Sequence, residues 1–169
     1  MRDFNKKEIL ETITPVIENT AMRYGLIPLE TTLERENNRW FLRIYIYSAN
    51  HNVSHLDCEN MSRGLGDMLD ELIPVKYYLE VSSPGLDRKF KSEKEYIIFR
   101  GHDVVIKLKN WVEGIPDKTI SALLLDYNES FGIKINYKNQ DFIIPMDKIH
   151  YTELNDKIEI NKNKGEKDD

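Results

Sequence analysis

The sequence has a single cysteine, Cys58, and no apolar run that approaches the ~20 residues needed to cross a bilayer. One cysteine can neither form an internal disulfide nor supply a cysteine-rich zinc site. The first residues are charged and lack the apolar stretch of a secretory signal peptide. We therefore expect a cytoplasmic protein that does not bind a membrane.

The sequence also lacks an excess of positive charge. It has 24 Lys and Arg against 29 Asp and Glu, a formal net charge of −5. Non-specific affinity for nucleic acid depends on Lys and Arg that displace counterions from phosphates. An acidic chain that binds RNA must therefore gather its cations in a patch, and the acidity argues for a basic protein partner at least as strongly as for RNA.

Motifs of catalysis are absent too. The sequence has no Gly-x-x-x-x-Gly-Lys phosphate loop, no Gly-x-Ser-x-Gly nucleophile elbow and no cluster with metal-ligand spacing. Cys58 is in line with Met61 and Leu65, which predicts a structural thiol rather than a nucleophile. The four histidines are scattered along the chain: His51, His55, His102 and His150. We expect no enzyme, no cofactor and no metal.

Apolar residues at helical spacing predict two helices in the N-terminal half. An apolar residue recurs every fourth position over residues 5–24, which predicts the first helix. Pro15 lies inside it and should bend or split it. The second helix is predicted from Ser54, where Asp57 can complete a capping box.

Alternating apolar residues predict three strands in the same half. Residues 29–33 and 40–46 should form a hairpin around Asn37-Asn38, since Asn tolerates the positive φ of a two-residue turn. Residues 77–81 should form a third strand, which a right-handed crossover makes parallel to the second. The predicted half is α-β-β-α-β, with a small mixed sheet and the helices on one face.

Three aromatic residues project from the opposite face of the second strand: Phe41, Tyr45 and Tyr47. They could stack bases as a platform for single-stranded nucleic acid. We favour packing against a helix or against the partner domain, because aromatic residues are common in strands whatever their function.

After Lys91 the pattern changes to short, closely spaced strands, which predict a small barrel. A tight helical turn is predicted at residues 145–149, before a last short strand. Residues 155–169 are polar and charged, and we expect them to be disordered. The predicted domains are residues 1–91 and 92–154, followed by the tail at 155–169.

Residues 80–88 read Glu-Val-Ser-Ser-Pro-Gly-Leu-Asp-Arg and resemble the signature segment of the bacterial ribosome maturation factor RimP family. Three further segments resemble the family in the right order: residues 38–43, 56–63 and 144–149. The sequence departs from the family at Lys89-Phe90, where Pro-Leu is usual, and at residues 70–74, where the loop is short.

The resemblance implies an α+β protein, with an N-terminal α/β domain and a C-terminal SH3-like (Sm-like) barrel. It implies a monomer without enzymatic activity that binds the free small (30S) ribosomal subunit and assists its late assembly. The implied partners are the small-subunit ribosomal RNA and a basic ribosomal protein near the decoding centre.

The signature is the first candidate for a partner contact. It comprises Ser82, Ser83, Pro84, Gly85, Leu86, Asp87 and Arg88. Pro84 pushes Ser83 into an extended conformation, and Gly85 permits a backbone geometry closed to other residues. Asp87 and Arg88 should present opposite charges at the edge of the turn, where the domains meet. The segment either contacts the ribosome or is a rigid turn that sets the domain angle.

A second candidate is a row of arginines along the hairpin, Arg35, Arg39 and Arg43, with Lys76 near it. These cations could touch ribosomal RNA. Carboxylates share the hairpin at Glu30, Glu34 and Glu36. A solvated surface of mixed charge is therefore the interpretation we favour.

Three other functions stay open. A generic RNA-binding module with KH-like and Sm-like pieces fits the order of elements, although the Gly-x-x-Gly loop is missing. An SH3-like adaptor for Pro-rich peptides would need an aromatic groove on the barrel. A hydrolase would need a histidine brought to Ser83 by the fold, since none is close to it in sequence.

Overall fold

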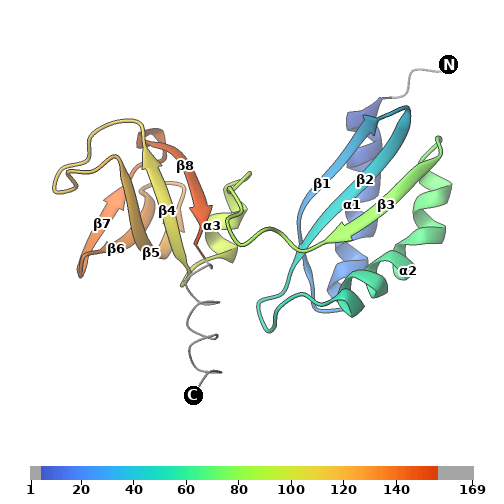
Figure 1. The fold of residues 1–169 in the computed structure, drawn as a ribbon, viewed down its shortest axis with the longest axis horizontal. Coiled ribbons are helices and arrows are strands. Elements are labelled where there is room, and N and C mark those ends of the chain that lie inside the picture. The colour runs from blue at the N-terminus through green and yellow to red at the C-terminus, as the bar shows by residue number, and fades with distance from the viewer. Residues whose placement is uncertain (1–4, 156–169) are drawn as a thin grey trace. The chain divides into compact units, whose positions relative to one another are not determined.

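The computed structural model describes residues 5–155, which divide into two compact units between Pro84 and Gly85 (Figure 1). The boundary expected after residue 91 stays a prediction. The expected tail lies outside the described residues, apart from Asn155. In the part of the chain described, no helix is both long and apolar enough to cross a membrane.

The first unit has the predicted α-β-β-α-β order. Its elements are α1 (Lys6–Arg23), β1 (Ile27–Glu36), β2 (Arg39–Tyr47), α2 (His55–Leu72) and β3 (Tyr77–Ser82). The sheet has the strand order β1-β2-β3, in which β1 and β2 are antiparallel and β2 and β3 are parallel. The mixed three-stranded sheet is therefore confirmed, and both helices lie on one face of it (Figure 1).

Polar side chains cap both helices of the first unit at their N-terminal ends, as predicted for Ser54 and Asp57 at α2. The Asn5 side chain accepts a hydrogen bond from the Glu8 N–H at the start of α1. Ser54 and Asp57 form a complete capping box at the start of α2. Of the two outcomes expected at Pro15, a bend or a split, the split is wrong, because α1 runs through it as one helix. Packing of α1 against the sheet on both sides of Pro15 holds the helix together.

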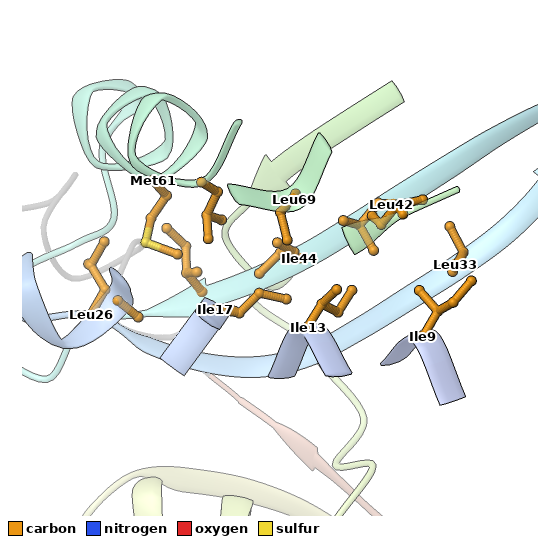
Figure 2. Packing of buried hydrophobic residues seen from close by; sticks show 13 residues of the cluster. Ile9, Ile13, Ile17, Leu26, Leu33, Leu42, Ile44, Met61 and Leu69 are labelled. Atoms are coloured by element: carbon orange, nitrogen blue, oxygen red, sulfur yellow. The ribbon is translucent and has the colours of Figure 1, made fainter. Parts of the chain in front are cut away.

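The core of the first unit lies between the helices and the sheet (Figure 2). Ile13 and Ile17 of α1 meet Leu42 and Ile44 of β2, and all four side chains are almost wholly inaccessible to solvent. Met61, Leu65 and Leu69 close the core from α2. Burying each such side chain contributes about 1.5–3 kcal/mol, so this layer carries most of the stability of the unit.

The hairpin turn is built as its sequence predicts. Asn37 and Asn38 have φ angles of 51° and 63°. Two successive residues at positive φ give a turn whose twist matches that of the flanking strands. The turn therefore sets the pairing of β1 with β2, in which Leu33 faces Leu42 across the hairpin.

The second unit is a five-stranded antiparallel sheet with a short helix. Its elements are α3 (Lys94–Ile98), β4 (Asp103–Leu108), β5 (Thr119–Asn128), β6 (Gly132–Tyr137), β7 (Gln140–Ile144), a 3₁₀ turn (Met146–Lys148) and β8 (Ile149–Leu154). The strand order is β7-β6-β5-β4-β8. The α+β class and the turn before β8 are confirmed. Among the described residues β7 and β8 do not pair, so the expected closure of the barrel is not observed.

Candidate functional site

One face of the N-terminal sheet is not covered by its helices, and the outward side chains of β2 and β3 lie on it. Alternation along β2 sends Leu42 and Ile44 into the core and places Phe41, Arg43 and Tyr45 on this open sheet face. The expected packing of the β2 aromatics against a helix is therefore wrong, because α1 and α2 lie on the other face (Figure 1). Their packing against a partner domain stays a prediction.

Arg43 is at the centre of the open sheet face and is neutralised by two carboxylates. Its Nη1 and Nη2 donate to the two carboxylate oxygens of Glu36 at 2.6 and 3.0 Å, and its Nε donates to Glu80 at 2.7 Å. The hydrogen bond from Arg43 holds the pKa of the Glu36 carboxyl below its usual value. This guanidinium is held in place, and its charge is largely compensated.

A second group on the same face gathers cations around one ring. The Arg39 guanidinium carbon lies 5.6 Å and the Lys76 Nζ 5.7 Å from the centre of the Tyr78 ring. The Phe41 ring lies 5.6 Å from that of Tyr78, centre to centre. Cations above an aromatic face are attracted by the ring quadrupole. This Tyr78 cluster (Arg39, Phe41, Lys76 and Tyr78) offers both positive charge and an aromatic surface.

The predicted row of three arginines is divided by the pleat of the sheet. Arg35 pairs with Trp40 across the hairpin and lies on the helix side, whereas Arg39 pairs with Glu36 on the open face. Of the three, Arg39 and Arg43 share the open sheet face, and Arg43 is engaged by carboxylates. Arg39 instead lies over the ring of Tyr78, almost 40 residues further along the chain, a contact that the sequence did not reveal.

The signature segment begins at the end of β3. Ser82 is the last residue of that strand and faces Tyr45 of β2, and Ser83 is exposed like Ser82. Gly85 does not have the positive φ that would demand glycine, so the expected special geometry is wrong. An added Cβ would lie 3.1 Å from the Asp87 carboxylate, so a side chain at this position requires the Asp87 side chain to shift slightly.

Arg88, the last residue of the signature, is buried in the second unit. Its Nε donates to Glu95 Oε1 at 2.5 Å, and the other oxygen of Glu95 accepts the N–H groups of Lys91 and Ser92 at 2.7 and 2.9 Å. The Arg88 carbonyl accepts the N–H of Leu154 at 2.8 Å. The sequence suggested an exposed charge at this position; the structure instead anchors the segment to β8 and α3.

A further arrangement of catalytic residue types lies at the end of β2. Ser48 Oγ is 3.2 Å from His51 Nδ1, and His51 Nε2 is 2.9 Å from Asp57 Oδ2. Ser48 is nearly inaccessible to solvent, and its oxygen accepts the N–H of Asn50. Asp57 is also engaged by the N–H of Ser54 in the capping box. The group therefore fixes the loop before α2, and it does not expose a nucleophile.

Residues 14–87 match a known protein family domain, the RimP N-terminal domain. The matched segment runs from within α1 through the open sheet face to Asp87 of the signature. The chain belongs to the RimP family. RimP proteins are ribosome maturation factors, non-catalytic assembly factors that associate with the small (30S) ribosomal subunit.

Membership in the RimP family explains why the signature stands out in the sequence, but the structure divides its residues between two tasks. Ser82 to Asp87 lie at the surface, apart from the half-buried Pro84, whereas Arg88 is an internal anchor of the second unit. The exposed part is the part available to a partner.

Proposed function

We propose that this RimP-family protein binds the free small ribosomal subunit and assists its late assembly without catalysing a reaction. The match to the RimP N-terminal domain over residues 14–87 carries this proposal. The proposed partners are the ribosomal RNA of the subunit and a basic ribosomal protein near the decoding centre. The protein acts as a monomer in the cytoplasm.

Two surfaces support contact with a particle made of RNA and basic protein. The Tyr78 cluster has the aromatic and cationic groups that bind unpaired bases and phosphates. The exposed signature residues include Asp87, whose carboxylate suits a basic protein. An acidic protein that carries a local cationic cluster can bind both RNA and a basic protein.

The test is sedimentation of the purified full chain with free small subunits, free large subunits and intact ribosomes, at two salt concentrations. Selective co-sedimentation with free small subunits is the expected result. Equal binding to all particles, lost on raising the salt concentration, would instead show a generic RNA-binding module, the second candidate that the Tyr78 cluster favours. Absence of binding to every particle would overturn both.

Variants of the signature test its part in binding. Asp87→Ala and Gly85→Val should weaken co-sedimentation with small subunits, and Glu113→Ala, an exposed carboxylate on the loop before β5, should not. Circular dichroism checks that all three variants are folded. Signature variants that fold and bind as well as Glu113→Ala does would show that the segment is not the contact surface.

A further inference from the structure

A second tyrosine with two cations lies on the C-terminal unit. Lys89 Nζ is 4.4 Å and Lys107 Nζ is 5.9 Å from the centre of the Tyr151 ring. The three residues come from the stretch before α3, from β4 and from β8, so the sheet assembles them from distant parts of the sequence. We define Lys89, Lys107 and Tyr151 as the Tyr151 cluster.

Strand register shows that the Tyr151 cluster lies on the outer face of the sheet. Lys107 is directly opposite Tyr151, and Lys89 bridges to Glu153 on the other side of β8. The intervening residues Ile106 and Thr152 are buried. Residues two apart on a strand share a face, so both lysines and the tyrosine point away from the core.

The charge of this cluster is not compensated as that of Arg43 is. Within residues 5–155, neither Lys89 nor Lys107 has a carboxylate at ion-pair distance. Glu153 is the neighbour of Lys89 across the strands, yet the Lys89 ammonium lies over the Tyr151 ring. Two ammonium groups near one ring repel each other, and a bound anion would relieve that repulsion.

The surroundings favour a nucleic-acid backbone as the anion. Thr119 and Ser121 of β5 are exposed on the same face, opposite Lys107 and Val105. Lysines, hydroxyl groups and an aromatic ring are the groups that bind phosphates, sugars and unstacked bases of single-stranded RNA. An acidic protein segment would use the lysines but would have no need of the ring or the hydroxyls.

We propose that the Tyr151 cluster binds the phosphate backbone of unpaired RNA. This proposal rests on the proposed function, since the small subunit supplies the RNA. It assigns the outer face of β4 and β8 as an RNA contact that the sequence did not indicate.

The test uses a short fluorescent single-stranded RNA and the full chain, with binding measured at several salt concentrations. The K89Q/K107Q double variant should lose affinity roughly tenfold at low salt. The slope of the logarithm of the binding constant against the logarithm of the salt concentration should become shallower by about 1.4, since each lost phosphate contact on a single strand removes about 0.7. The matched control is K134Q/K138Q, which makes the same charge change on β6 and its turn. Tyr151→Leu should weaken binding with a salt slope close to that of wild type.

Several results would overturn the proposal. One is a K89Q/K107Q variant that binds RNA like K134Q/K138Q, another is a Tyr151→Leu variant that binds like wild type, and a third is a wild-type protein that binds no RNA. Polyglutamate that competes as well as RNA of equal charge would show a generic anion site instead. Wild-type protein that still co-sediments with small subunits in any of these cases would leave the proposed function standing while this inference fails.

Discussion

The two units use their central arginines in opposite ways. Arg43 in the first unit pairs with Glu36 and Glu80 at the surface, where these carboxylates are about half exposed, at 48% and 50%. Arg88 in the second unit pairs with Glu95 in the interior, where the side chains are 6% and 0% exposed. The surface network sets the charge of the open sheet face, whereas the buried pair holds a segment of chain in place.

The two units also have one structural feature in common, a tyrosine ring with two cations over it. In each, two cations lie over one tyrosine: Arg39 and Lys76 over Tyr78, and Lys89 and Lys107 over Tyr151. This shows how a chain of net charge −5 can still present positive charge locally. Among residues 5–155 none of these four cations has a carboxylate at ion-pair distance, and each is attracted to its ring instead.

The largest difference between the two units is expected when Arg88 or Arg43 is replaced by leucine. Arg88→Leu leaves the Glu95 carboxylate buried and without its cation, which should lower the free energy of unfolding of the second unit by about 3–5 kcal/mol. Arg43→Leu, at the surface, should have a much smaller effect on the first unit. Amide hydrogen exchange, followed separately for β1–β3 and β4–β8, measures both. Equal losses of unfolding free energy in the two variants would show that the buried and the surface arginine contribute alike.

Two glycines at positive φ extend the comparison to the backbone. Gly25 has φ +67° with open space around it, whereas a Cβ on Gly132, at φ +94°, would collide with the Ile144 carbonyl. Gly25→Ala should cost about 1–2 kcal/mol from its φ angle alone. Gly132→Ala should cost more, because the end of β7 must also move. Urea denaturation of both variants measures the difference, and a smaller loss for Gly132→Ala would contradict the geometry.

The two hairpin turns allow a finer test, because their angles are the same. Lys138 and Asn139 have φ of 51° and 63°, as Asn37 and Asn38 do. Lys138→Gly should stabilise the second unit by about 1 kcal/mol, since a lysine at positive φ is strained. Asn37→Gly should stabilise the first unit by less, because Asn tolerates this conformation. Thermal unfolding gives both values; a larger gain at Asn37 would refute the argument.

The smallest expected effect is the response of α2 to acid. A hydrogen bond from the Ser54 N–H, with a further one from His51, holds the pKa of Asp57 below its usual value. The stability that this carboxylate contributes is therefore present above about pH 4 and is lost as the pH falls through the lowered pKa. The protection factors of the amides in the first turn of α2, which are corrected for the intrinsic pH dependence of exchange, should fall in that range for wild type.

Asp57→Asn is the control for this acid response. The amide keeps an oxygen acceptor for the Ser54 N–H but does not titrate, so the protection factors in the first turn of α2 should no longer depend on pH below about 4. An unchanged pH dependence in Asp57→Asn would assign the acid response to another group.

Sequence by itself determined most of the local structure and the family. Ser54 and Asp57 cap α2 because side-chain hydrogen bonds reach only a few residues along the chain, and Asn37-Asn38 forms its turn for the same local reason. Periodic burial along α1 and alternation along β2 are set by helix and strand geometry, so the core residues could be named in advance. The signature string was enough to indicate the RimP family.

Only the tertiary structure decided which charges meet. Arg88 and Glu95 pair inside the second unit, Arg35 is separated from Arg39 by the pleat, and Lys89 meets Lys107 over Tyr151. Such partners depend on strand register and burial, which are set by contacts between residues far apart in the chain. Electrostatic energy depends on distance and solvent exposure, and neither can be read from sequence spacing alone.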